Sequence, residues 1–477
     1  MKKKYNLNLK SPFYTFEIDE DYFIYDGGTG ILSQVSNEIH DIIKYLQVYD
    51  VNIEEDYISL LEILKKSYSD EEIHSAFNSL QTNNDEGFLV DNINVYKSLK
   101  VINEISKEES YKGGLWLNLS HDCNLRCKYC YAECGSFGDE RLLMTEEMAK
   151  KCINYWYEKI DKNQKIFDIV FFGGEPFINK DVMLFSINYI NDLVAKLGAK
   201  AKYNVTTNGT IYDENLIKLL SENYINLVIS VDGLEKIHNA NRPYASGKNS
   251  FSDISKNIKK IKKYIPIIHG KITMKKSDIH LFVESVKTLW GMGINSVYGD
   301  LVISKDESYE YDDYKKYHEQ IKKLSDLTYK NIIEGNKFIY NGVTKGFETI
   351  NLRKRVNLCS LFSNGSFVFS PKGDIYKCHR FVGDTEYKVG NICDEDLDIL
   401  NHRLKKTKIE KCCNCWAQLT CGDGCPFEHK LDTGDMTKPS EGWCNKIRIN
   451  QEECIKLYAK LFLQANKKKS GGLYDEK

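Results

Sequence analysis

The sequence predicts an α/β protein whose central part alternates strands and helices. Between residues 113 and 335, short runs rich in branched and aromatic residues are separated by stretches with helical periodicity. Six such units in series predict a parallel sheet, either an open doubly wound sheet or a partial (β/α)6 barrel. The expected strands are Leu115–Ser120, Phe167–Phe172, Lys202–Thr206, Leu227–Val231, Ile267–Thr273 and Ser296–Val302.

Distinctive motifs directly follow the first four expected strands. They are a cysteine cluster, Gly173-Gly174-Glu175-Pro176, Thr207-Asn208-Gly209 and Asp232-Gly233. Active sites of parallel α/β proteins lie at the carboxyl ends of the strands. The sequence therefore predicts that these motifs meet at one end of the sheet.

Residues 1–95 predict a small domain of strands followed by helices. Strands are expected at Tyr14–Ile18 and Tyr22–Tyr25, and a third should start at Gly30 after a glycine turn. Ser69 and Glu72 form a capping-box pattern, with Ile73, Phe77 and Leu80 behind it at helical spacing. Residues 95–112 are expected to be a polar connector.

Length, charge and cysteine content narrow the class of protein. A chain of 477 residues predicts about two to four domains. The net charge of −2 gives no reason to expect nucleic acid or an anionic membrane as a partner. We find neither a secretion signal nor an apolar run long enough to span a membrane, so a cytoplasmic location is expected. In that reducing compartment the 15 cysteines favour metal binding over disulfides.

The first cysteine cluster has the spacing of an iron–sulfur site. Cys123, Cys127 and Cys130 form a Cys-x3-Cys-x2-Cys loop, which can hold three corners of a [4Fe–4S] cube and leave one iron open. Cys134 is a weaker candidate ligand. A zinc loop is the alternative, although zinc favours four protein ligands in paired knuckles.

Residues 357–450 are cysteine-dense and rich in loops, which predicts a region held together by metal. An amphipathic helix is expected near Gln451–Gln464, within a C-terminal helix and tail at 451–477. A structural zinc module is the alternative for this region. The cysteines concerned are Cys359, Cys378, Cys412, Cys415, Cys421, Cys425 and Cys444.

The first cluster, with the aromatic Tyr129 before its third cysteine, resembles the signature of the radical S-adenosylmethionine (SAM) superfamily. The resemblance implies that the open iron binds SAM, whose reductive cleavage yields a radical that abstracts hydrogen from a substrate. It implies that the backbone of the Gly-Gly-Glu-Pro segment receives the methionine amino group. The residues that would contact SAM are Gly173, Gly174, Glu175, Pro176, Thr206, Asn208, Ser230, Asp232, Arg242 and Tyr129.

The later cysteines resemble the SPASM extension of radical SAM enzymes that modify peptides. By that pattern the extension holds two auxiliary [4Fe–4S] clusters, which makes three in the chain. An outer cluster would use Cys412, Cys415, Cys421 and Cys444, and an inner one Cys359, Cys378 and Cys425. Some family members have a further cysteine soon after the first, but none lies between Cys359 and Cys378, so the inner cluster would be open to a substrate thiolate. Cys393 and Cys413 are spare candidates for that position, and otherwise they, like Cys152 and Cys454, would be buried thiols.

Residues 1–95 resemble a winged-helix-like precursor-peptide recognition element, in which a leader peptide adds as a strand to the sheet edge. The alternative is a small structural cap. Together the three parts resemble maturases of cysteine-rich ribosomal peptides, of the sactipeptide and ranthipeptide types, which join a Cys sulfur to a carbon. The resemblance implies a cytoplasmic enzyme of an anaerobic bacterium, reduced by a flavodoxin or ferredoxin.

Other chemistries stay open. Sulfatase-maturing enzymes carry an Asp base after the cysteine that matches Cys378, whereas this chain has His379. His379 could titrate near the site, but a structural role is favoured. The alternatives are formylglycine formation, carbon–carbon crosslinking, epimerisation, or a zinc-stabilised peptide-binding protein without catalysis.

Overall fold

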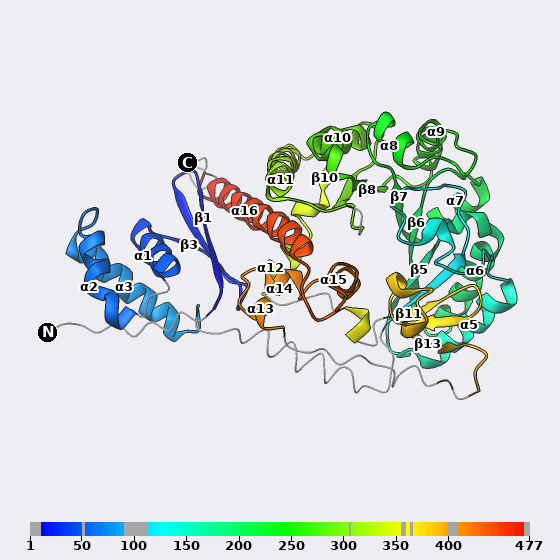
Figure 1. Ribbon diagram of the computed structural model, residues 1–477, viewed down its shortest axis with the longest axis horizontal. Coiled ribbons are helices and arrows are strands. Elements are labelled where there is room, and N and C mark those ends of the chain that lie inside the picture. Colours follow the sequence, from blue (N-terminus) through cyan, green and yellow to red (C-terminus); the bar gives the residue numbers. More distant parts are fainter. Residues whose placement is uncertain are drawn as a thin grey trace, which may run out of the picture.

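The computed structural model describes residues 11–49, 53–89, 113–304, 307–353, 359–362, 366–395, 397 and 409–471. The expected connector at 95–112 lies outside the described residues. Figure 1 shows the N-terminal helices and sheet at one end of the molecule and the large parallel sheet with its helices at the other. The C-terminal helices lie between these two parts.

The N-terminal part is a three-stranded antiparallel sheet followed by three helices. The strands β1 (Phe13–Ile18), β2 (Asp21–Asp26) and β3 (Leu32–Val35) pair in chain order, and α1 (Asn37–Tyr49), α2 (Ile53–Leu64) and α3 (Asp70–Asp85) follow. Ser69 caps α3 in the predicted capping box with Glu72. The third strand starts two residues later than expected because Gly30, at φ +74°, still belongs to the turn and donates to Asp26 O.

Side chains of the N-terminal sheet alternate between two cores. Ile24 packs with helices α1 to α3, whereas its neighbours Phe23 and Tyr25 face the opposite side. There they pack against Cys454 and Ile455 of the long C-terminal helix α16 (Glu441–Gly471). The period of two along β2 thus ties this sheet to the rest of the protein.

The central part contains the predicted parallel sheet. Its six strands are neighbours in chain order, as expected, and α5, α6, α7, α8 with α9, and α10 connect them in turn. Only β9 starts at the predicted residue: β4 and β5 begin one residue earlier, β6 two earlier, β7 three earlier and β8 two later. The bounds are β4 (Gly114–Ser120), α5 (Glu146–Lys159), β5 (Ile166–Gly173), α6 (Lys180–Ala195), β6 (Lys200–Thr207), α7 (Glu214–Ser221), β7 (Tyr224–Ser230), α8 (Glu235–Asn241), α9 (Phe251–Ile261), β8 (His269–Met274), α10 (Phe282–Gly291), β9 (Ser296–Leu301) and α11 (Tyr311–Ile333).

The sheet continues beyond these six strands on both edges. The short β10 (Ile339–Tyr340) pairs with β9, and β11 (Ser366–Phe369) pairs in parallel with β4. The antiparallel strands β12 (Asp374–Tyr376) and β13 (Lys388–Asn391) complete a ten-stranded sheet. The cysteine-rich C-terminal third is therefore joined to the central part by backbone pairing.

The remaining helices are short except for the last. Helix α16 starts ten residues before the expected Gln451 because Cys444 and its neighbours already belong to it. The others are α12 (Phe347–Leu352), α13 (Glu410–Cys413), α14 (Gln418–Cys421) and α15 (Pro426–Thr433). Short 3-10 turns are η1 (Glu133–Gly135), η2 (Pro176–Asn179), η3 (Lys276–Leu281), η4 (Asn341–Val343), η5 (Ser360–Phe362), η6 (His379–Phe381) and η7 (Thr385–Tyr387).

Gly27 allows the turn after β2 to dock on the cysteine-rich region. A Cβ at this position would lie 2.4 Å from the backbone oxygen of Trp416, the residue after Cys415. Nearby, the Tyr14 ring stacks on the Trp416 ring at a centroid distance of 4.7 Å. The N-terminal sheet thus contacts the backbone of a predicted cluster-binding loop.

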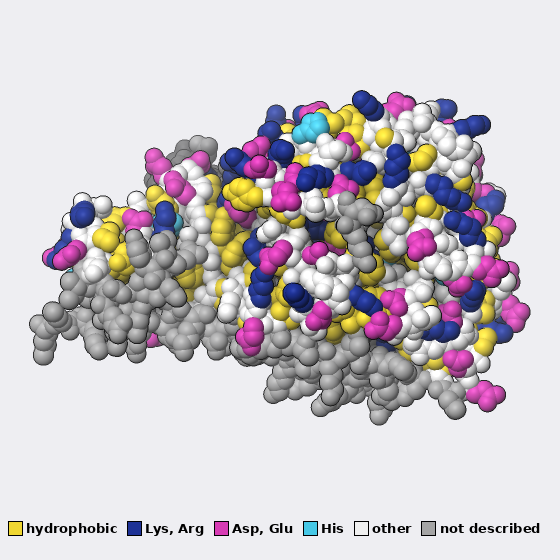
Figure 2. Space-filling model, viewed as in Figure 1, with side chains coloured by type: hydrophobic (Ala, Val, Ile, Leu, Met, Phe, Trp, Pro, Cys, Tyr) yellow, Lys and Arg dark blue, Asp and Glu magenta, His cyan; other side chains and the backbone are white. Residues whose placement is uncertain are grey.

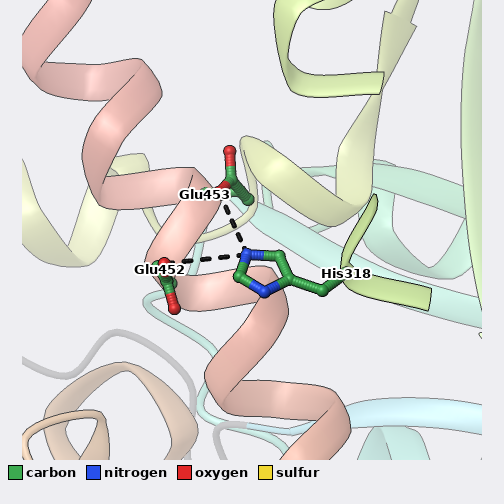
Figure 3. Close-up of side chains that lie close together, drawn as sticks. All are labelled: His318, Glu452 and Glu453. Atoms are coloured by element: carbon green, nitrogen blue, oxygen red, sulfur yellow. Dashed lines mark hydrogen bonds and ion pairs between the residues drawn. The ribbon is translucent and has the colours of Figure 1, made fainter. Parts of the chain in front are cut away.

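Charged groups join α11 to α16 (Figure 3). His318 Nε2 lies 3.2 Å from a carboxylate oxygen of Glu453 and 3.6 Å from one of Glu452. Lys456 Nζ lies 2.5 Å from Glu452. Because Lys456 and His318 each pair with both carboxylates, we interpret the group as an inter-helix ion network and not as a metal site.

The surface does not gather charge of one sign on the face shown in Figure 2, where acidic and basic side chains are interspersed. Within the described ranges, no helix has the length and apolar character needed to cross a bilayer.

The His318 network predicts a pH-dependent contribution to stability. Its hydrogen bond to Glu453 raises the pKa of His318, so protonated His318 favours the folded state. This contribution is complete below the pKa of the unfolded histidine and is lost as the pH rises through the raised pKa. His318→Gln should therefore lower the free energy of unfolding by about 0.5 kcal/mol at about pH 5.5 and by less at about pH 9, since the pair is partly exposed.

Urea denaturation at the two pH values measures this difference. His280→Gln, on the exposed 3-10 turn η3, is the matched control and should leave the pH profile of the wild type unchanged. An equal loss for His318→Gln at both pH values would contradict the ion-pair interpretation.

Candidate functional site

The first cysteine loop follows β4 and is fixed by its neighbours. The backbone N–H of Arg126 donates to Pro243 O at 2.8 Å, and that of Lys128 donates to Asn241 O at 3.0 Å. The loop therefore rests on the segment after α8. Cys123, Cys127 and Cys130 all line one cavity at the carboxyl ends of the strands.

The glycine pair after β5 passes very close to this loop. Gly173 has φ +127°, and a Cβ on Gly174 would lie 2.2 Å from Asp122 O. Only glycine fits such an approach without moving the backbone. Gly173 and Gly174 line the same cavity, as the sequence predicts for residues that offer backbone to a ligand.

Glu175 does not face the cavity but organises its wall from behind. The fully buried carboxylate accepts hydrogen bonds from the Thr207 hydroxyl at 2.7 Å and from the Asn208 N–H at 2.6 Å. Burial raises its pKa to about 7. The side-chain amide nitrogen (Nδ2) of Asn208 in turn lies 3.7 Å from Cys123 Sγ. Glu175 thus positions the Thr-Asn-Gly turn against the first cysteine.

Asp232 likewise lies behind the wall. Its buried carboxylate pairs with Arg242 Nε at 3.0 Å, accepts from the Thr273 N–H at 3.0 Å and also accepts from the Tyr129 hydroxyl. Arg242 is buried too and lies 4.0 Å from Cys127 Sγ. Asp232 therefore fixes the cation and the phenol that border the cysteines.

The cavity has a volume of about 530 Å³. Of the residues expected to contact SAM, it is lined by Gly173, Gly174, Thr206, Asn208, Ser230, Arg242 and Tyr129. Glu175, Pro176 and Asp232 are absent from its lining. They follow the strands directly and are buried behind the wall, so contact of these three residues with SAM stays a prediction.

The later cysteines form two groups. Cys412, Cys415, Cys421 and Cys444 line one small cavity, and we call them the outer group. The thiols of Cys359, Cys378 and Cys425 lie close enough to raise one another's pKa, and we call them the inner group. The grouping corresponds to the sets that the sequence resemblance implies.

The inner group adjoins the first cavity. His379 and Arg380, directly after Cys378, and Phe427 and Glu428, shortly after Cys425, line the same cavity as the first cysteine loop. Tyr131, the residue after Cys130, joins the first cysteine loop to these neighbours of the inner group. Its ring centre lies 6.4 Å from that of His379 and 6.2 Å from that of Phe427.

Comparison with known proteins decides the family. Residues 117–289 match the sequence model of the Radical SAM superfamily. A protein of unknown function from Methanocaldococcus jannaschii is 32% identical over 302 residues, which cover 62% of this chain and 93% of that protein. The chain belongs to the radical SAM superfamily.

Other relatives extend over different lengths. The cysteine-type anaerobic sulfatase-maturating enzyme of Clostridium novyi is 29% identical over 64% of this chain and 85% of its own length. The radical SAM cyclopropyl synthase TigE of Paramaledivibacter caminithermalis is 23% identical over 90% of this chain and 92% of its own. Among solved structures, native anSMEcpe with bound AdoMet superposes with a TM-score of 0.61 and 22% identity, over 73% of this chain and 98% of that one. That structure supports the fold.

Radical SAM proteins use a [4Fe–4S] cluster and SAM, and the first cavity fits both. Burial raises the pKa of Cys123 to about 12 and that of Cys127 to about 11, so clustered thiolates here require a cation. A bound metal supplies that charge. The cavity adds hydroxyl, amide and guanidinium groups from Thr206, Ser230, Asn208 and Arg242, which suit the polar parts of SAM.

The outer and inner groups also fit metal. Burial raises the pKa of Cys421 to about 11 and that of Cys378 to about 12, and neighbouring cysteines contribute in each group. Four thiols around one small cavity match a fully ligated cluster, and three thiols beside an open cavity match one with a free position. The chemistry of these groups agrees with two auxiliary clusters.

The other cysteines lie elsewhere. Cys134 lies beside Cys127 and Cys130, yet it does not line the SAM cavity. Cys393 is exposed and lies near Cys152 and Lys151, which places it apart from the inner group for which it is a spare candidate. Cys413 is buried in α13, and Cys454 is buried against the N-terminal sheet.

His379 is held as a neutral aromatic ring. It stacks on Trp116 at a centroid distance of 4.6 Å and meets Phe172 edge-on at 5.3 Å. Burial lowers the pKa of His379 to about 3, so the ring is uncharged at neutral pH. This agrees with the structural role that the sequence favours.

Sequence reasoning missed a charged wall of the cavity. Lys271 pairs with Asp300, and Arg380 pairs with Glu428 at 2.9 Å. Arg380 and Glu428 lie within three residues of expected cluster ligands, which is a usable signal. Lys271 and Asp300 give none, because a charged residue inside a strand reads as an ordinary solvent-facing position.

The buried pair of Asp232 and Arg242 predicts a large effect of a small substitution. Asp232→Asn should destabilise the protein by about 3 kcal/mol, because it leaves the Arg242 guanidinium buried without a counter-charge. It should also weaken SAM binding about tenfold, since Arg242 lines the cavity. Urea denaturation and an anaerobic SAM titration measure the two effects.

Asp213→Asn is the matched control, because Asp213 pairs with Lys180 at the surface. Its cost should stay below about 1 kcal/mol. Wild-type SAM affinity in Asp232→Asn would show that Arg242 does not depend on Asp232.

Proposed function

We propose that this chain is a peptide-modifying radical SAM enzyme that installs thioether crosslinks, from a Cys sulfur to a carbon, in a cysteine-rich ribosomally synthesised precursor peptide. The observation that carries the proposal is the inner group of three cysteines, whose sequence neighbours line the cavity that also contains the expected SAM contacts. A site with one free ligand position would bind a thiolate, and the incoming peptide cysteine is the matching ligand.

The position of the inner group supports this reading. Residues 379 and 380, next to Cys378, and Phe427 and Glu428, next to Cys425, border the same cavity as Ser230 and Arg242. A peptide sulfur held at the inner group would therefore lie beside the cavity in which SAM is expected to bind. Holding both partners converts an encounter in solution into a reaction between neighbours.

The residues of the chain have distinct parts in this reaction. When bound, SAM and its cluster supply a hydrogen-abstracting radical. Cys359, Cys378 and Cys425 hold the sulfur site, and the aromatic wall of Tyr131, His379 and Phe427 excludes water. Overall, one C–H and one S–H bond break and one C–S bond forms. One hydrogen leaves as an atom, and the other leaves as a proton while one electron passes to an external acceptor.

Formylglycine formation is the first competing reaction, and the sulfatase-maturating relatives make it compatible with the family. His379 occupies the position of the Asp base in that reaction. Its neutral ring, stacked on Trp116 and in edge contact with Phe172, is a poor base at neutral pH. The side chain at this position therefore favours the thioether reaction.

Carbon–carbon bond formation is the second competing reaction. It is favoured by the match to a cyclopropyl synthase over 90% of the chain, which includes most of the N- and C-terminal parts. The two reactions differ in what happens to the peptide thiols, because only a thioether consumes them.

The test is the mass and thiol content of the peptide product. The protein would be reconstituted anaerobically with iron, sulfide, SAM and a reductant, and then incubated with a cysteine-rich precursor peptide that carries its leader. We expect the loss of two hydrogen atoms per crosslink and one fewer alkylatable thiol, stable to a disulfide reductant. Cys378→Ala should abolish the change while SAM cleavage continues. Loss of hydrogen with all thiols still alkylatable would support the carbon–carbon reaction instead.

A groove in the N-terminal part supports binding of the leader. It runs between the outer strand β3 and helix α3 and is lined by Ser33, Gln34, Val35, Ser36, Ile39, Ser79, Leu80, Asn83 and Phe88. Since β3 pairs only with β2 among the described strands, its other edge can accept an added strand. We propose this groove as the leader site.

Filling the groove should separate leader binding from chemistry. Ser79→Trp places a large ring over the groove, so KM for the leader-bearing peptide should rise about tenfold or more, as for lost hot-spot contacts. Ser75→Trp, one turn earlier on α3 and outside the groove, should leave KM unchanged. Equal KM values for the two variants would reject the groove as the leader site.

A further inference from the structure

Five charged side chains that alternate in sign form a chain beside the cavity, and four of them, Lys271, Asp300, Arg380 and Glu428, line it. Lys271 of β8 pairs with Asp300 of β9, and Asp300 lies 3.3 Å from Lys446 of α16. Lys446 lies 3.8 Å from Glu428 of α15, and Glu428 pairs with Arg380 at 2.9 Å. The chain of charges therefore runs from strands β8 and β9 of the central sheet through helix α16 to the residues beside the inner group.

Lys446 is the central member. Its side chain is only 3% exposed, and it lies between two carboxylates, that of Asp300 on β9 and that of Glu428 on α15. The Trp443 ring also covers the Lys446 ammonium, since the ring centre lies 4.3 Å from Nζ. Without Lys446, Asp300 would keep its partner Lys271 and Glu428 would keep its partner Arg380, but the contact that joins these two pairs would be lost, which allows the pairs to separate.

Separation would move functional residues. Helix α15 starts at Pro426, directly after Cys425 of the inner group, and its first turn carries Phe427 and Glu428 into the cavity lining. Asp300 belongs to a rigid strand of the central sheet. The contacts of Lys446 therefore join α15, which directly follows the inner group, to the sheet that also carries Ser230.

We propose that Lys446 is a positioning residue, a buried ammonium that locks α15 to β9 and thereby fixes the inner cysteine group relative to the SAM cavity. The consequence for catalysis rests on the proposed function. The structural claim does not, because it concerns only the placement of α15. Lys446 also follows Cys444 of the outer group by two residues. The same turn of α16 therefore contributes to the outer group and contacts both β9 and α15.

The chain offers a matched control on the same helix. Lys460 also joins α16 to another helix, since its Nζ lies 2.9 Å from a carboxylate oxygen of Asp326 on α11. This pair is exposed and lies apart from the cavity. A general effect of losing a lysine bridge on α16 would appear in Lys460→Met as well. An effect of the buried position would appear only at Lys446.

The experiment compares Lys446→Met, Lys446→Arg and Lys460→Met in the iron-loaded full chain. Hydrogen exchange should accelerate at least about tenfold in α15 of Lys446→Met alone, as expected for a locally opened segment. The electron paramagnetic resonance spectrum of the reduced auxiliary clusters should shift in Lys446→Met and return towards the wild type in Lys446→Arg. With precursor peptide, kcat should fall about tenfold or more with KM for SAM unchanged, because small misplacements of reacting groups are costly.

Each other outcome overturns the proposal. Wild-type exchange and spectra in Lys446→Met would do so, and so would an equal change in Lys460→Met. If Lys446→Met does not fold, Lys446→Gln, which keeps a polar partner for both carboxylates, replaces it under the same criteria. A wild-type enzyme that leaves the peptide unmodified would reject the proposed function, while exchange and spectra would still decide the role of Lys446.

Discussion

The pairing of β11 with β4 is the constraint on which the catalytic cavity depends. Val368 lies opposite Trp116, and Phe369 lies opposite Leu117, so the C-terminal third begins as one more strand of the central sheet. The hairpin that follows brings His379 onto the Trp116 ring and Val382 into a core with Phe137 of the first cysteine loop. Backbone pairing at one sheet edge thus places the inner group against the SAM site.

Several features of this arrangement are readable from the sequence because they are local. The six central strands, the Ser69 capping box and the motifs at the strand ends follow from periodicity, capping chemistry and the geometry of parallel sheets. In each case the residues that carry the signal are close in sequence or belong to one repeated unit. The two later cysteine groups are different, because their division rests on the family resemblance and not on spacing.

Other features are not readable because they depend on residues far apart in the chain. Nothing in Ser366–Phe369 shows that it joins β4, about 250 residues earlier, because a four-residue apolar run fits many partners. The roles of Glu175 and Asp232 show the same limit. Both belong to motifs at the right place, but only the strand direction in three dimensions decides that they support the cavity from behind.

Burial of charge near the cysteines has a common physical reason. Thiolates in a poorly solvated site need positive charge, and iron provides it only where the protein backbone holds the sulfurs in place. The chain fixes that backbone with buried ionic groups: Glu175 holds the Thr-Asn-Gly turn, and Asp232 holds Arg242 and Tyr129. Such groups are costly to bury and are stable only when fully paired, so they define one geometry and disfavour others. A cavity that holds clustered thiols in one arrangement gains from that rigidity, which apolar packing alone specifies less sharply.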